Sequence, residues 1–441
     1  MSPASAQARQ RRQLRRGAAG VCLFGVIVGG ALQAFWSGFP PMATGAAAWA
    51  AGVLLWPDLA SRSRRQALVL LAVGVGGLAL GWSRGMPPLW PQVFAGNAAL
   101  IAMLAAVGFL RLITAPAEGE DHTPPAGRRA MRSTILGLHL FGAVVNLSTI
   151  FIMARRMAPH GHLDSRQVRL LTRGFSSAAF WSPFFAAMAA ALTYAPGAKL
   201  GALVAVGLPL AVVALGVTLT ELERSRERPD TFQGYPMNPR SLWLPALLGL
   251  IILVLHGIRP SLSVLGIIAA LAPGITAVTL ALRREPVLER VGAQITRGLP
   301  LMAGELSLFL AAAVMAGGLE SVFATTGEWL PFTTFAGPQA AMVLAMLVAL
   351  ALVGVHPLIG IAAASSLLAP VVPDSNLLAM TFLCAWAIGV SVSPLSGLNL
   401  AMQGAYGLRG LDILRWNLPY GAVMLVTAMI ALNVYAWIAG I

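Results

Sequence analysis

The sequence predicts an all-α polytopic membrane protein with eleven transmembrane helices and two re-entrant hairpins, arranged as two inverted repeats. Of its 441 residues, 57% are hydrophobic and 10% are charged, and the mean hydropathy is +0.77. An ordinary soluble domain carries about 25% charged residues. Apolar runs long enough to cross a bilayer recur from residue 18 to the carboxyl terminus. This composition excludes a soluble globular protein and makes the lipid bilayer the predicted environment.

The distribution of basic residues predicts the orientation of the chain. The net charge is +14, but the arginines lie in short loops between apolar runs, which is typical of membrane topology signals rather than of nucleic-acid binding. Assigning each loop to a side places 27 basic residues in the cytoplasm and three outside, Arg84, Lys199 and Arg259. We therefore expect a multi-pass protein of the bacterial inner membrane, with a cytoplasmic amino terminus and an external carboxyl terminus.

The predicted spans are apolar runs of about 20 residues. The first, 18–36, follows five arginines and lacks a nearby signal-peptidase site, so we expect it to be retained. Two spans contain an internal Ser-Pro pair and are predicted to be interrupted, 175–196 and 375–405. The other spans are 41–58, 66–83, 90–112, 199–221, 242–258, 261–282, 298–319 and 418–440.

Two further apolar stretches are predicted to be hairpins that enter and leave the bilayer on the same side. The stretch 338–370 would measure about 50 Å as one helix, against a hydrocarbon core of about 30 Å, and His356-Pro357 lies near its middle. The stretch 133–157 has arginine clusters on both sides. Both clusters stay in the cytoplasm only if this stretch turns back.

Short matches between the two halves predict an internal repeat. The matched segments are Ala95-Gly96-Asn97 with Ala303-Gly304-Glu305, Asn146 with His356, Ser182-Pro183 with Ser393-Pro394, and Gly201-Ala202 with Gly421-Ala422. The predicted organisation is a basic tail with an extra first helix (1–40), a first repeat (41–222), a cytoplasmic linker (223–241) and a second, inverted repeat (242–441).

The hairpin tips and the interrupted helices form the predicted substrate site, because irregular backbone at membrane depth is tolerated only in protein or beside a wet cavity. Freed amides at half-helix amino ends attract anions, and freed carbonyls attract cations. The same polar residues could instead be kinks or interhelical hydrogen bonds. The candidate substrate-binding residues are Asn146, Ser148, Thr149, Ser182, Pro183, His356, Pro357, Ser393, Pro394, Ser396 and Asn399.

Glu305 is a candidate for proton coupling, because a carboxylate within a span is costly unless it is paired, protonated or hydrated. The alternative is a side chain that reaches the cytoplasmic surface toward Arg297. No phosphate-binding loop or metal-ligand cluster appears, and the two cysteines lie in apolar runs. We expect no cofactor and no enzymatic activity.

The layout resembles the ion transporter superfamily, which includes divalent anion/sodium symporters, arsenite-pump membrane subunits and gluconate and citrate permeases. The likeness lies in the paired hairpins, the paired interrupted helices and the extra first helix. The first tip, Asn146-Leu147-Ser148-Thr149, is similar to the Ser-Asn-Thr tip of the symporters, whereas Val355-His356-Pro357-Leu358 departs from it. The resemblance implies a homodimer in which hairpins and interrupted helices move against a fixed scaffold.

The expected function is secondary transport of a small organic or inorganic anion, coupled to an ion or to protons. A cation/proton antiporter or efflux permease that uses Glu305 is the first alternative. A non-transport membrane assembly protein is the second, and it would require a catalytic cluster near an interface, which the sequence does not show.

Overall fold

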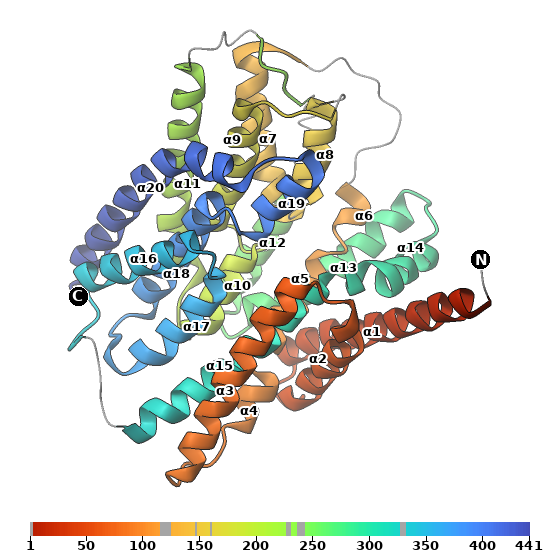
Figure 1. Ribbon diagram of the computed structural model, residues 1–441, viewed down its shortest axis with the longest axis vertical. Coiled ribbons are helices and arrows are strands. Elements are labelled where there is room, and N and C mark those ends of the chain that lie inside the picture. Colours follow the sequence, from red (N-terminus) through yellow and green to blue (C-terminus); the bar gives the residue numbers. More distant parts are fainter. Residues whose placement is uncertain are drawn as a thin grey trace. The chain divides into compact units, whose positions relative to one another are not determined.

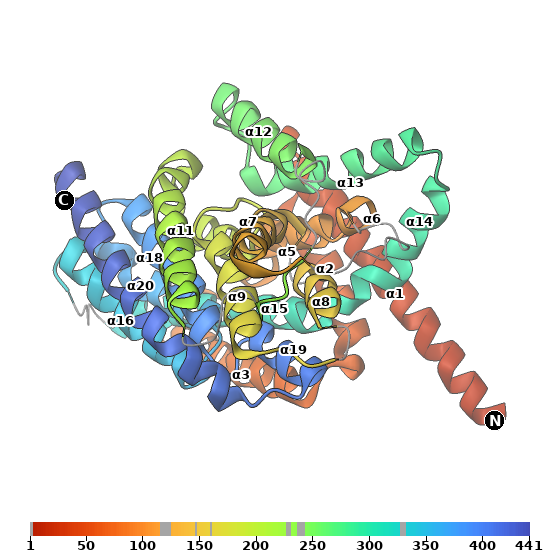
Figure 2. The same ribbon diagram turned by 90° about the horizontal axis from the view of Figure 1, so that it is seen from above.

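The structure, a computed structural model, describes residues 3–114, 125–145, 148–158, 161–225, 231–235, 243–326 and 332–441. Throughout these ranges the regular elements are helices, and the only strand-like pairing is an isolated bridge between Ala126 and Gln233 (Figures 1 and 2). The predicted all-α class is confirmed.

The chain forms two compact units that interleave along the sequence. The first unit comprises residues 1–115 and 254–330, and the second comprises residues 116–253 and 331–441. Each unit therefore takes one segment from each predicted repeat. The bounds of the predicted repeats do not coincide with those of the compact units and stay a prediction. Both predicted hairpins and both interrupted helices fall in the second unit.

Eight helical segments within the described residues are long and apolar enough to cross a membrane. They are 7–35, 61–83, 90–114, 200–223, 264–282, 287–325, 375–406 and 410–439. The predicted spans 41–58, 175–196 and 242–258 contain shorter helices. The count of eleven spans therefore stays a prediction.

The first unit is built from long helices that approach closely at glycines. Its helices are α1 (Pro3–Phe35), α2 (Pro41–Leu55), η1 (Trp56–Asp58), α3 (Ser61–Ser83), α4 (Trp90–Ala95), α5 (Ala98–Val107), α6 (Arg111–Thr114), α13 (Val264–Leu282), α14 (Val287–Ala293), η5 (Gln294–Gly298), η6 (Leu299–Met302) and α15 (Ala303–Thr326). The boundary between the units falls within α12 (Trp243–Ile258).

Helices α3 and α15 run parallel and side by side (Figures 1 and 2). A Cβ at Gly74 would overlap the backbone of Val314, and one at Gly77 would overlap that of Gly318. In a bilayer, helices associate by such close packing of small residues because lipid is as apolar as leucine. The glycines of α3 therefore explain why this pair packs backbone to backbone.

The second unit likewise combines long and short helices. They are α7 (Gly127–Val145), α8 (Ser148–Met157), α9 (Ser165–Ser176), η2 (Ser177–Phe180), α10 (Ala186–Tyr194), α11 (Leu200–Glu223), α16 (Gly337–Leu352), α17 (Pro357–Leu368), η7 (Ala369–Val371), α18 (Ser375–Val392), α19 (Gly397–Tyr406) and α20 (Gly410–Ala439). Of the predicted linker 223–241, residues 231–235 lie against α7, where the amide of Gly127 donates to the carbonyl of Phe232 at 3.0 Å.

Helices α16 and α17 form the second predicted hairpin. The 16 residues of α16 span about 24 Å, which is less than a hydrocarbon core. Gly354 turns the chain with a φ of +94°, a conformation that side chains disfavour. Helix α17 then starts at Pro357, where the missing amide hydrogen costs no helical hydrogen bond. The break at His356-Pro357 is confirmed, whereas re-entry into a bilayer stays a prediction.

Helices α7 and α8 contact each other and form the arms of the first predicted hairpin. Helix α7 begins in the arginine cluster and ends at Val145, and α8 begins at Ser148. The tip residues Asn146 and Leu147 lie outside the described residues.

Candidate functional site

The first interrupted helix is open between the end of η2 at Phe180 and the start of α10 at Ala186. Ser182 lies in this break and is fully buried. Its hydroxyl donates to the carbonyl of Ala143 at the end of α7 and accepts from the amide of Phe184 at 3.2 Å. Ser182 therefore joins the break to the hairpin of the same half.

The two breaks share one local turn. In Ser182-Pro183 and in Ser393-Pro394, the serine hydroxyl accepts from the amide two residues further on, Phe184 at 3.2 Å and Leu395 at 3.3 Å. Such side-chain bonds to nearby amides compete with helical hydrogen bonding. The proline removes a further backbone donor. The same sequence thus stops both helices in the same way.

The second interrupted helix is open between Val392, which ends α18, and Gly397, which starts α19. Ser396 is the amino cap of α19, because its hydroxyl oxygen accepts from the amide of Asn399 at 3.2 Å. The same hydroxyl donates to the carbonyl of Val390 at 2.9 Å. Ser396 therefore joins the two half-helices to each other.

The side chain of Asn399 donates hydrogen bonds to carbonyls that the break leaves free at the end of α18. Its amide nitrogen donates to the carbonyls of Val390 at 3.3 Å, Ser391 at 3.2 Å and Ser393 at 2.8 Å. The residue is fully buried, yet its Oδ1 accepts no hydrogen bond from the described residues. Buried oxygens without donors are rare in native proteins. Only Oδ1 of this side chain remains for a ligand.

Thr149 is the described site residue nearest the first hairpin tip. It lies in the first turn of α8, is 5% exposed, and its Oγ1 has no hydrogen-bond partner among the described residues. Ser148 starts α8, but its side chain and the whole of Asn146 lie outside the described residues. The first tip therefore contributes one buried, free hydroxyl.

The second hairpin tip contacts the second break. A Cβ at Gly354 would overlap the side chain of Leu395, so the two segments touch. His356 caps α17, because its Nδ1 accepts from the amide of Leu358 at 3.2 Å. Its ring lies edge-on to Trp386, with 5.4 Å between centroids. Nδ1 of His356 thus stabilises the hairpin tip.

The two interrupted helices are joined by Asn417 of α20. Its amide nitrogen donates to the hydroxyl of Thr172 in α9 at 3.2 Å and to the carbonyl of Ser391 in α18 at 3.0 Å. Its Oδ1 accepts from Nε of Arg173 at 2.8 Å, and Arg173 pairs with Glu221 at 2.6 Å. One hydrogen-bonded network therefore runs from α11 through α9 and α20 to the second break.

Arg173 belongs to the arginine cluster after the first hairpin, which predicts only a cytoplasmic loop, whereas its side chain is 0% exposed. Its guanidinium lies 4.8 Å from the ring centroid of Tyr420. Its hydrogen-bond partners Glu221 and Asn417 lie 48 and 244 residues away along the chain. No local pattern around Arg173 could have revealed this network.

A second network missed in the sequence surrounds His139 of α7. The indole nitrogen of Trp181 donates to Nε2 of His139 at 2.9 Å. Because indole can only donate, Nε2 must accept, and the imidazole proton lies on Nδ1. Nδ1 is 2.8 Å from the hydroxyl of Ser177, which in turn donates to the carbonyl of Gly174 at 2.8 Å. This geometry requires a neutral His139 and fixes the hairpin against the first break.

The glycine contacts favour Gly207, six residues beyond the predicted Gly201, as the counterpart of Gly421. A Cβ at Gly201 would meet nothing within 4 Å. In contrast, Gly207 packs on the carbonyl of Phe180 at the first break, as Gly421 packs on Val392 at the second. Gly207 is therefore the structural counterpart of Gly421.

Glu305 lies in the first unit, whereas both breaks belong to the second. It is exposed, and it forms no ion pair with Arg297 or with any other described residue. The adjacent Gly304 lies beside Ser63, so Glu305 is level with the arginine-rich start of α3. This level favours the alternative of a side chain near the membrane surface.

The fold and the site define an α-helical multi-pass membrane protein with two interrupted helices and two helix pairs at the predicted hairpins. In fold the chain is similar to the crystal structure of the YdaH transporter of Alcanivorax borkumensis, with a TM-score of 0.52 and 13% sequence identity. The similarity covers 84% of this chain and 98% of the other. No family model and no curated protein matches the sequence.

Proposed function

We propose that this protein is a secondary active transporter of a small organic or inorganic anion, driven by an ion or proton gradient. The observation that best supports this proposal is that one compact unit holds both predicted hairpins and both interrupted helices. In known transporter architectures, substrate and coupling-ion sites lie where broken helices meet at mid-membrane. The similarity in fold to a transporter supports the same function.

The free polar groups indicate where the solute would bind. Helices α17 and α19 have their amino ends capped by His356 and Ser396, whereas α10 has no side-chain cap. An uncapped amino end offers amide donors and the positive end of the helix dipole. Together with the free hydroxyl of Thr149, this end of α10 favours an anion bound in the first half of the site.

The proposal also covers the assembly of the transporter, its topology and the roles of individual residues. The transporter would be a homodimer in a bacterial inner membrane, with its amino terminus in the cytoplasm. Ser182 and Ser393 would hold the breaks in shape, and Asn146 and Ser148 would line the tip. Proton coupling through Glu305 is less favoured, because that residue lies in the other unit at the level of the α3 arginines.

The purified chain in proteoliposomes tests this function. Uptake of labelled succinate, citrate, gluconate and arsenite would be measured under an imposed sodium or proton gradient. We expect one of these anions to accumulate only when a gradient is present. Absence of gradient-driven uptake and of exchange for the whole panel would contradict the proposal of anion transport.

Thr149→Val tests the site within that assay. The change keeps the shape and removes a hydroxyl that has no partner among the described residues. Thermal stability should therefore be unchanged, while the apparent KM rises by about fivefold or more, the equivalent of one lost hydrogen bond. Thr276→Val is the matched control, because that buried hydroxyl bonds only to Ala272 of its own helix, at 2.7 Å. Equal transport by both variants would exclude Thr149 from the site.

A further inference from the structure

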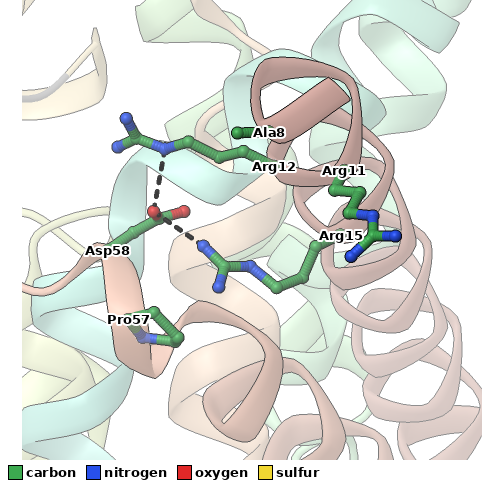
Figure 3. Close-up of a pocket in the computed structure, with 6 residues that line it drawn as sticks. All are labelled: Ala8, Arg11, Arg12, Arg15, Pro57 and Asp58. Atoms are coloured by element: carbon green, nitrogen blue, oxygen red, sulfur yellow. Dashed lines mark hydrogen bonds and ion pairs between the residues drawn. The ribbon is translucent and has the colours of Figure 1, made fainter. Parts of the chain in front are cut away.

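A charged cavity lies where the amino-terminal part of α1 meets η1 (Figure 3). Its volume is 550 Å³, and all its residues belong to the first unit. The lining residues are Ala8, Arg11, Arg12, Arg15, Pro57 and Asp58. No part of the proposed transport mechanism uses this cavity.

Asp58 orients two of the arginines. Nε of Arg12 lies 3.0 Å, and an Nη of Arg15 2.9 Å, from the same carboxylate oxygen. The carboxylate is 9% exposed, and Arg16 approaches its other oxygen at 3.8 Å. Such pairing holds the guanidinium planes in place, since an arginine fork binds oxyanions in a fixed geometry.

Positive charge remains in excess after this pairing. Asp58 is the only acidic residue among the first 117 of the sequence. Arg11 forms no hydrogen bond or ion pair with any described residue, and its guanidinium points away from Asp58 (Figure 3). Nε of Arg15 has no acceptor within the described part of the chain. Several arginine donors at this cavity are therefore free for an anion.

The depth of the cavity identifies the source of that anion. The apolar part of α1 begins at Ala18, so the rise of the helix places Arg15 about 4 Å and Arg11 about 10 Å beyond the hydrocarbon boundary. The headgroup layer is about 5–8 Å thick on each side of the bilayer. Trp56, at the end of α2, is a residue type that anchors at this level. Arg15 thus lies within the headgroup layer, and the long side chains of Arg11 and Arg12, whose backbone lies just beyond it, can extend back to the lipid phosphates.

We propose that Arg11, Arg12 and Arg15 bind the phosphate of an anionic phospholipid headgroup, and that Asp58 positions Arg12 and Arg15 for this contact. The lipid would fix the amino-terminal part of α1 to the rest of the first unit. The site does not depend on which solute the second unit transports.

The test uses the full-length protein in detergent, titrated with short-chain phosphatidylglycerol and, separately, with short-chain phosphatidylcholine. A surface arginine contributes about fivefold to the affinity for an anionic lipid. Arg11→Gln should therefore weaken phosphatidylglycerol binding about fivefold, and it touches nothing that holds the fold. Arg11→Gln with Arg12→Gln and Arg15→Gln should weaken it about 100-fold, with phosphatidylcholine binding unchanged.

The matched control removes the same charge from another cytoplasmic arginine cluster, through Arg128→Gln, Arg129→Gln and Arg132→Gln in α7. This control should leave the affinity within about twofold, the scatter expected of charges outside the site. An equal loss in both triple variants would overturn the proposal. Inorganic phosphate that competes at the concentration of the lipid would overturn the assignment to a lipid headgroup.

Asp58→Asn separates a binding site from a structural ion pair. If the carboxylate only ties α1 to η1, the variant loses stability equally in phosphatidylcholine and phosphatidylglycerol vesicles, which overturns the proposal. If the arginines bind lipid phosphate, the variant loses stability in phosphatidylcholine vesicles and recovers it with phosphatidylglycerol, because the phosphate replaces the missing carboxylate.

Discussion

The two interrupted helices of the second unit start from the same Ser-Pro turn but satisfy their polar groups differently. At the first break, Ser182 bonds across to the hairpin helix α7, and α10 has no side-chain cap. At the second, Ser396 and Asn399 bond back to the carbonyls of α18. The second break thus has hydrogen bonds within its own segment in addition to the one from Asn417, whereas the serine of the first break bonds to a neighbouring helix. The same local turn in two repeats therefore does not imply the same role. The first break, with the uncapped amino end of α10, is the better candidate for binding the anion.

The network that joins the breaks should have the largest effect when it is disrupted. Arg173→Met removes the partner of Asn417, Glu221 and the carbonyl of Trp416. Glu221 is 32% exposed and keeps its pair with Arg169, so the cost falls on the buried Oδ1 of Asn417 and the carbonyl of Trp416. We expect a loss of about 2–3 kcal/mol in the free energy of unfolding, the cost of leaving such buried acceptors without their charged donor. The measurement is a denaturant titration in detergent. Arg132→Gln, which breaks an exposed pair with Glu223, should cost less than about 1 kcal/mol.

Asn399→Ala tests whether the second break is self-contained. Three carbonyls at the end of α18 lose their shared donor, although each keeps one other, from the hydroxyl of Ser396, from Asn417 or from the amide of Ser396. We expect a loss of about 1–3 kcal/mol from the lost hydrogen bonds. Asn433→Ala is the control, since that exposed side chain donates only to Met429 of its own helix. If the two variants are equally stable, water or another group satisfies these carbonyls.

A glycine substitution at each break compares the packing of the two halves. Gly207→Ala places a methyl group against the backbone carbonyl of Phe180, whereas Gly421→Ala meets a side-chain methyl of Val392 that can move. We expect a loss of about 1–3 kcal/mol for the first and less for the second. Gly201→Ala, which faces open space, should be neutral. A larger loss of unfolding free energy for Gly201→Ala than for Gly207→Ala would favour the match of Gly201 with Gly421 instead.

The smallest expected effect distinguishes the two serines. Ser182→Ala removes a bond to Ala143 and a bond from Phe184, and should cost about 1–2 kcal/mol. Ser393→Ala removes only a 3.3 Å bond from Leu395 and should cost less than about 1 kcal/mol. The same titration measures both, and a reversed order would mean that the second break, not the first, depends on its serine.

Much of this fold could be predicted from local sequence. Proline and glycine restrict the backbone locally, and their positions are visible in the sequence. The predicted breaks at Ser182-Pro183, His356-Pro357 and Ser393-Pro394 therefore lie at the residues where the helices are interrupted. Eight of the eleven predicted apolar runs likewise coincide with helices that are long and apolar enough to cross a membrane. The residues that fill those breaks were harder to assign, because a hydrogen bond from Asn417 to Thr172 joins positions 245 residues apart.

The sequence by itself determined the membrane environment, the helical class and the positions of the breaks, because these depend on hydropathy and on backbone restrictions within a few residues. Only the tertiary structure decided how segments from both halves combine into two interleaved units. It also decided that Arg173 is buried and that Asn399 bonds to the carbonyls beside its own helix. Partners of buried polar groups are set by which distant helices pack together, and no periodicity along one helix records that choice.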